Sequence, residues 1–163
     1  MVKKRRKEKK GGRDGKEKKG IILVLSGGGA KGLAHIGVIE EFEEHNLPIK
    51  RIIGTSAGAL IGGTYAAGKL AKVKEFFLGM TKIDVFNLFF SFPSLSSIFN
   101  SKKLDNLVRG FTKEVEISEL EIPFNSVAFD IISRKKVVFE KGDLFDAIRS
   151  SISIPGFFKP FRW

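Results

Sequence analysis

Two short glycine-rich segments contain the residues best suited to chemistry. The first is G-G-G-A-K-G at residues 27–32, and the second is G-T-S-A-G at residues 54–58. A G-x-S-x-G segment between a strand and a helix holds its serine, here Ser56, on a sharp turn with the hydroxyl exposed. The other segment can present main-chain N–H groups to a developing oxyanion. Together they indicate a nucleophilic serine that faces an oxyanion hole.

Apolar runs precede both segments, and helical patterns follow them. Residues 21–25 and 49–53 are apolar runs of the kind that buried parallel strands show. The pattern predicts one helix over residues 33–44 and another, rich in glycine and alanine, over residues 57–67. This β-α-β unit predicts an α/β fold with a parallel sheet. Close approach of the second helix to the sheet is expected to offset the low helix propensity of its glycines.

The later part of the chain predicts a hairpin and a helix. Residues 124–132 and 135–139 read as strands of an antiparallel hairpin near the edge of the sheet. Asp143 is placed to cap the N-terminus of a helix over residues 144–151.

The segment from residue 70 to residue 112 is rich in phenylalanine, and its end, residues 102–111, predicts a further helix. We expect the aromatic rings of residues 70–112 to pack in the core. The alternative is that some of them form an apolar lid or an acyl-chain cleft. The rings concerned are Phe76, Phe77, Phe86, Phe89, Phe90, Phe92 and Phe99.

The positive charge is concentrated at the N-terminus. The chain has 163 residues and a formal net charge of +11, and its first 20 residues hold eleven lysines and arginines against three acidic residues. This distribution argues against a nucleic-acid partner. Residues 1–19 are therefore predicted to be a disordered basic tail, with attraction to an anionic membrane surface as the alternative.

Other features of composition limit the location of the protein and its chemistry. No apolar h-region of a signal peptide lies between the basic tail and the first predicted strand, and no apolar run approaches ~18 residues. We therefore expect neither a signal peptide nor a transmembrane segment. We expect a cytoplasmic location, with peripheral contact to membranes as a further option. The chain has no cysteine, which excludes disulfides and thiolate metal sites.

The first glycine segment also fits the G-x-G-x-x-G pattern of dinucleotide-binding proteins. That function needs an acidic residue at the end of the second strand, and none is present there. Lys31 is followed by Gly32 rather than by serine or threonine, so the segment is not a phosphate-binding Walker loop. A nucleotide-binding α/β module is the weaker alternative. Another alternative is that Ser56 merely caps a helix.

The two histidines do not complete an ordinary catalytic triad. His35 and His45 both precede Ser56, whereas α/β-hydrolases have the order serine, acid, histidine. We expect His35 to be a packed or capping side chain and His45 to end a helix.

Four segments together resemble the patatin-like phospholipases: S-G-G-G-A-K-G-L-A-H-I-G at residues 26–37, G-T-S-A-G at residues 54–58, V-A-F-D at residues 127–130 and A-I-R-S-S-I-S-I-P-G-F-F-K-P at residues 147–160. The resemblance implies that residues 20–163 form a patatin-like domain that is incomplete at its C-terminus. It also implies a three-layer α/β/α sandwich with a mostly parallel central sheet.

The same resemblance implies hydrolysis of acyl esters in phospholipids or related lipids by a serine–aspartate dyad, without histidine, metal or cofactor. By position, Ser56 is the nucleophile. The oxyanion hole is formed by Gly27, Gly28 and Gly29, and the residues that support the motifs are Lys31, Gly32, Gly54 and Gly58.

The chain departs from the family pattern at the second catalytic residue. In the family this aspartate lies in an Asp-Gly-Gly or Asp-Gly-Ala segment shortly after the Pro-Gly-Phe block, but no aspartate follows Asp146 here. Asp14 lies in the tail, and Asp130 matches a non-catalytic aspartate of the family. We therefore expect either the N-terminal part of a longer domain or an inactive form. A non-catalytic lipid-binding or membrane-binding remnant is the alternative.

Overall fold

The computed structural model describes residues 20–90, 96–154, 158 and 160–162. The basic tail expected over residues 1–19 lies outside the described residues. The same is true of residues 91–95, which include Phe92.

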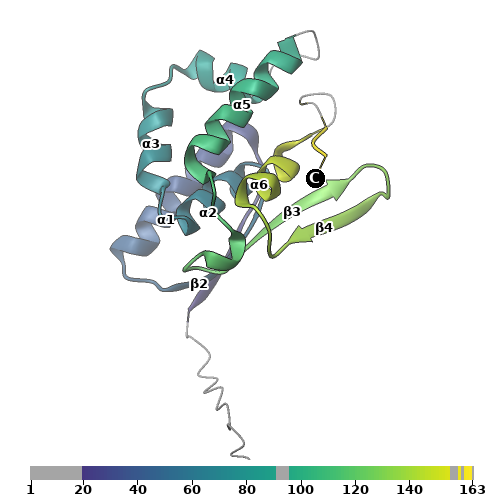
Figure 1. The fold of residues 1–163 in the computed structure, drawn as a ribbon. Coiled ribbons are helices and arrows are strands. Elements are labelled where there is room, and N and C mark those ends of the chain that lie inside the picture. Colours follow the sequence, from purple (N-terminus) through teal and green to yellow (C-terminus); the bar gives the residue numbers. More distant parts are fainter. Residues whose placement is uncertain (1–19, 91–95, 155–157, 159, 163) are drawn as a thin grey trace, which may run out of the picture.

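The described residues contain a four-stranded mixed sheet, and the helices gather on one side of it (Figure 1). Its strands are β1 (Ile21–Leu25), β2 (Ile49–Thr55), β3 (Phe124–Asp130) and β4 (Lys135–Phe139), in the spatial order β1-β2-β3-β4. The first three strands are parallel, and β4 returns antiparallel to β3. This confirms the open α/β fold with a mostly parallel sheet and the hairpin at its edge.

Within the described residues, six α-helices and two short 3-10 helices connect or follow these strands. They are η1 (Gly29–Leu33), α1 (Ala34–Glu44), α2 (Ala57–Ala66), α3 (Leu70–Leu78), α4 (Lys82–Phe90), α5 (Ser96–Thr112), η2 (Ile117–Glu119) and α6 (Leu144–Ile152).

The order of the strands determines which face of the sheet the helices cover. The chain moves in one direction from β1 to β2 to β3, and crossovers between parallel strands are right-handed. Both helical crossovers therefore lie on the same face. Leu23, Ile52 and Phe124 on that face belong to the hydrophobic core, whereas Val24 and Phe129 on the opposite face are mostly exposed. The described residues thus form two of the three expected layers.

Helix α2 packs closely because it is built from small residues. A Cβ atom on Gly62 would lie 2.7 Å from Cγ2 of Ile52 in the sheet, and one on Gly63 would lie 2.8 Å from Cδ1 of Ile148 in α6. These distances are shorter than real Cβ contacts, so only glycine fits without movement. The expected close approach of α2 to the sheet is confirmed, and α6 approaches α2 in the same way.

The phenylalanine-rich segment forms α3, α4 and α5. Phe77 is buried in the core, whereas Phe86 is about half exposed. Leu78 and Ile83, at the junction of α3 and α4, are more exposed still. Core packing therefore accounts for part of this segment. The side chains of Phe89, Phe90 and Phe99 lie outside the described side chains.

Candidate active site

Ser56 lies on the turn between β2 and α2 in a backbone conformation that side chains rarely adopt. Its φ is 52° and its ψ is −121°. A non-glycine residue with such a positive φ carries strain of about 1–3 kcal/mol, which persists only where the surrounding structure enforces it. The side chain is partly buried rather than enclosed. The turn is therefore as sharp as the G-x-S-x-G pattern predicts.

The two glycines of this turn are required by the packing of the backbone. A Cβ atom on Gly54 would lie 2.4 Å from the carbonyl oxygen of Gly58. A Cβ atom on Gly58 would lie 2.2 Å from the carbonyl oxygen of Leu25, at the end of β1. Any side chain at either position would collide with main-chain atoms that cannot swing away. The glycines thus allow the serine turn to sit against the end of β1.

The first glycine segment runs beside this serine. A Cβ atom on Gly27 would lie 3.2 Å from Cβ of Ser56 and 3.9 Å from its Oγ. Gly29 has a φ of 53°, which a glycine adopts without strain. A Cβ atom on Gly32 would lie only 2.4 Å from Cβ of Ala57 in the first turn of α2. The two glycine segments are therefore packed against each other, as their sequence spacing suggested.

The remaining residues of the first segment form the short helix η1. The N–H of Lys31 donates to the carbonyl oxygen of Gly28 at 3.1 Å, which closes the turn after the glycines. The side chain of Lys31 is exposed, whereas Gly32 is buried. Helix α4 packs against η1, so the phenylalanine-rich segment borders this loop.

The histidines have structural contacts of the kind expected. Nε2 of His35 lies 2.9 Å from the carbonyl oxygen of Ser26, at the start of the glycine segment. His45 caps the C-terminus of α1, where its Nδ1 lies 2.9 Å from the carbonyl oxygen of Glu41. Neither imidazole makes a hydrogen bond to Ser56 within the described residues. His35 therefore helps to hold the loop that faces the serine.

Sequence reasoning missed one side chain at this site, that of Ser151 in α6. The N–H of Ser56 donates to Oγ of Ser151 at 2.7 Å, and that hydroxyl donates to the carbonyl oxygen of Val127 at 2.6 Å. Oγ1 of Thr55 donates to the same carbonyl at 3.1 Å. The available signal was the position of Ser151 inside the last of the four family-like segments.

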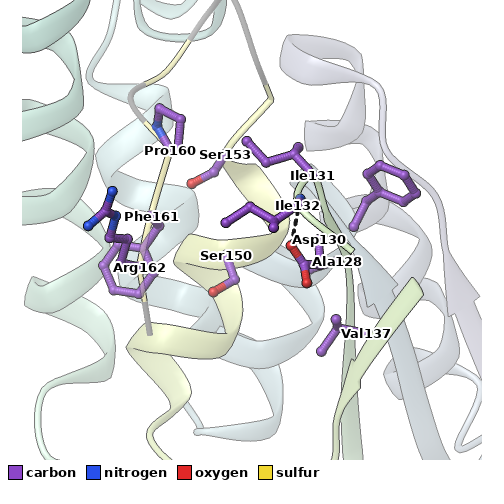
Figure 2. Close-up of a pocket in the computed structure, with 11 residues that line it drawn as sticks. Ala128, Asp130, Ile131, Ile132, Val137, Ser150, Ser153, Pro160, Phe161 and Arg162 are labelled. Carbon is purple, nitrogen blue, oxygen red and sulfur yellow. Dashed lines mark hydrogen bonds between the residues drawn. The ribbon is translucent and has the colours of Figure 1, made fainter. Parts of the chain in front are cut away.

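Two neighbouring cavities open at the carboxyl ends of β2 and β3, where ligands commonly bind in open α/β sheets. The one closer to Ser56 has a volume of about 320 Å³, and its lining includes Thr55, Ser151 and Ile154. The other, of about 260 Å³, is shown in Figure 2 and includes Ile131 and Phe161 in its lining. Both linings combine apolar side chains with serine hydroxyls, which suits an ester with an apolar chain.

Asp130 closes the end of β3 beside the second cavity (Figure 2). Its carboxylate accepts a hydrogen bond from Oγ of Ser133 at 2.5 Å and another from the N–H of Ile132 at 2.9 Å. The Ser133 bond, followed by the Ile132 bond, lowers the pKa of Asp130 below its ordinary value. The carboxylate is thus engaged in its own turn, which fits a structural residue rather than a base for Ser56.

Comparison with known proteins agrees with the geometry of the two loops. The family model for patatin-like phospholipase matches residues 23–163, which is most of the chain. The chain belongs to the patatin-like phospholipase family.

Three relatives show how far this family likeness extends. Two uncharacterized NTE family proteins of Mycobacterium tuberculosis are 39% identical over 140 residues and 36% identical over 143 residues. A mouse protein named patatin-like phospholipase domain-containing protein 6 is 31% identical over 145 residues. The matches cover 86%, 85% and 86% of this chain but only 39%, 24% and 11% of the relatives, respectively. The patatin-like chain therefore spans well under half the length of these relatives.

Membership of the family supports a lipid hydrolase at the level of the family. Among the helices that the structure describes, none combines the length and the apolar character needed to cross a membrane.

Proposed function

We propose that this patatin-like protein is a serine acyl hydrolase that cleaves acyl esters of phospholipids or related lipids. The observation that carries the proposal is the strained Ser56 turn with the Gly27 loop packed beside its Oγ. A structural serine at a helix N-terminus needs no positive φ, and a capping serine accepts a hydrogen bond from the helix. Ser56 makes no such side-chain cap.

The reaction proceeds through an acyl-enzyme. Oγ of Ser56 attacks the ester carbonyl carbon and gives up its proton, and the carbonyl oxygen becomes an oxyanion held by main-chain N–H groups of Gly27, Gly28 and Gly29. Collapse of this intermediate breaks the ester C–O bond, and the departing alkoxide takes a proton. Water then attacks the acyl-enzyme and releases the fatty acid. An oxyanion donor of this kind is typically worth about 10²–10³ in rate.

The proton of Ser56 needs an acceptor, because a serine hydroxyl is a weak nucleophile at its free pKa. The family resemblance assigns this task to an aspartate in an Asp-Gly-Gly or Asp-Gly-Ala segment, which the 163 residues do not contain. We therefore expect these 163 residues by themselves to acylate slowly and to turn over poorly. Restoring such a segment is expected to raise the rate.

Two alternatives to this function are a nucleotide-binding module and a non-catalytic lipid-binding protein, and the glycine loop bears on the first. It packs against Ser56 and Ala57, which favours an oxyanion hole over a dinucleotide site. The exposed Leu78 and Ile83 are the observation that favours a non-catalytic lipid-binding protein. Liposome co-sedimentation without ester turnover would support that alternative.

A fluorophosphonate probe tests the proposal on the full-length natural protein. We expect the wild type to be labelled at Ser56 and the Ser56→Ala variant to lose labelling and esterase activity together. Ser118→Ala is a matched control, since Ser118 lies on η2 before β3, at the opposite end of the parallel strands. Absence of labelling in the wild type, or equal labelling of Ser56→Ala, would contradict the assignment of the nucleophile.

A further inference from the structure

The main-chain N–H of Ser56 is held by a side chain that is distant in the sequence. It donates to Oγ of Ser151, 95 residues further along the chain, at 2.7 Å. The same Oγ donates its own proton to the carbonyl oxygen of Val127 at 2.6 Å. One hydroxyl of α6 therefore links the serine turn to β3.

This link is formed where the backbone pairing of the sheet ends. The register of β2 against β3 runs as far as the pair Thr55 and Val127. Ser56 is the next residue, and its positive φ turns the chain out of the strand and into α2. Because a conformation of this kind persists only when its surroundings enforce it, the contact at this point matters more than an average surface hydrogen bond.

We propose that Ser151 is a positioning residue for the reaction at Ser56. By fixing the Ser56 amide, its hydroxyl sets the direction in which the Ser56 side chain leaves the turn and keeps Oγ beside the Gly27 loop. This inference rests on the proposed function. Misplacement of a reacting group by about 1 Å can lower a rate by roughly 10²-fold.

The link also determines which N–H groups serve the oxyanion. The Ser56 N–H is occupied by Ser151 and points toward α6, so it is not a donor for the substrate. In the first turn of α2, the N–H groups of Ala59 and Leu60 already donate to the carbonyl oxygen of Ser56. The proposed donors are therefore those of the glycine loop.

The effect of removing the Ser151 hydroxyl should be confined to the serine turn. The carbonyl oxygen of Val127 keeps the hydrogen bond from Thr55 Oγ1, so β3 is not left without a donor there. The Ser56 N–H, by contrast, loses its acceptor. Ser118 provides the control, because it is an exposed serine on η2, at the opposite end of the parallel strands.

The test compares the wild type, Ser56→Ala, Ser151→Ala, Ser151→Thr and Ser118→Ala in the full-length natural protein. A fluorophosphonate gives the rate constant and the stoichiometry of labelling, and a short-chain p-nitrophenyl ester gives kcat and KM. We expect Ser151→Ala to react roughly 10- to 100-fold more slowly at full stoichiometry, with the loss in kcat rather than in KM. Ser151→Thr keeps the hydroxyl and should restore most of the rate. Ser118→Ala should match the wild type.

Several outcomes would overturn the inference. If Ser151→Ala reacts at the wild-type rate, or loses stoichiometry of labelling but keeps the rate, Ser151 contributes only to folding and the inference is wrong. If in that case Ser56→Ala still loses its labelling, the proposed function stands without this inference. A wild type that does not react removes the proposed function and this inference together. If Ser151→Ala does not fold, Ser151→Cys keeps the size but offers a weaker acceptor. Its rate should fall between those of Ser151→Thr and Ser56→Ala, and a wild-type rate would contradict the role.

Discussion

At the scale of single residues, the hydrogen bonds and backbone conformation of a polar side chain decide its role more than its residue type does. Ser56 and Ser151 are both serines near the same turn, yet one is held at a positive φ and the other bridges an N–H and a carbonyl. His35 holds the main chain of the glycine loop at Ser26 instead of accepting a proton from the serine. The residue type alone therefore does not tell which of these side chains reacts and which one holds the backbone.

The turn that follows β3 gives a prediction for pH. Asp130 has its pKa lowered from 3.8, chiefly by the hydrogen bond from Ser133. We expect Ser133→Ala to raise the pKa of Asp130 toward its ordinary value, measured from the carboxyl carbon shift in an NMR titration. Ser118→Ala should leave it unchanged, and an unshifted Asp130 in Ser133→Ala would contradict the assigned cause.

The direction of the accompanying stability change follows from the sign of the shift. A lowered pKa means that the folded state favours the carboxylate, so the contribution of Asp130 is present above its ordinary pKa. It is lost as the pH falls through the lower, folded-state pKa. In Ser133→Ala this contribution should shrink or disappear.

At the scale of elements, α6 supplies Ser151 to the site and depends on its N-cap residue, Asp143. The Asp143 side chain accepts a hydrogen bond from the N–H of Asp146 at 2.9 Å and so caps the helix, as the sequence predicts. We expect Asp143→Ala to lower the free energy of unfolding by about 1 kcal/mol, measured by urea denaturation. Asp143→Asn keeps the acceptor and should be nearly neutral. Equal losses in the two variants would argue that charge, not capping, stabilises α6.

Local patterns in the sequence were sufficient for the elements around the site. Ile21–Leu25 and Lys135–Phe139 have the expected bounds, because apolar runs and turn residues are local signals. The helix after Asp143 ends one residue later than expected, at Ile152, and the strand expected to reach residue 132 ends at Asp130. There the chain bends into a turn that the carboxylate of Asp130 stabilises.

Contacts between distant elements were beyond the reach of such patterns. Arg149 is almost fully buried. Its charge is compensated by Asp105 of α5, and its Nη1 donates a hydrogen bond to Oγ of Ser153. Nothing in the spacing of these residues marks them as partners, because α5 and α6 are separated by two strands. Ser151 escaped notice for the same reason. The nucleophile and its loop could be proposed from the sequence, but the side chain that holds their geometry could not.

At the scale of the whole molecule, the two faces of the sheet differ in a way that mutation can test. Leu23 and Val24 are neighbours in β1, yet Leu23 is 8% exposed beneath the helices and Val24 is 69% exposed on the other face. We expect Leu23→Thr to lower the free energy of unfolding of the 163-residue chain by roughly 2–4 kcal/mol, and Val24→Thr by less than about 0.5 kcal/mol. Chemical denaturation measures both. A large loss in Val24→Thr would show that this face is covered in solution.

The long separation between Ser56 and Ser151 has a consequence for biosynthesis. As the polypeptide leaves the ribosome, β1, the glycine loop and the serine emerge first, and the hydroxyl that fixes the serine amide follows 95 residues later. Until that part of α6 has been translated, a nascent chain carries the serine without the contact that shapes its turn. Under the proposed function, we expect competence for ester cleavage to arise only after Ser151 has been synthesised.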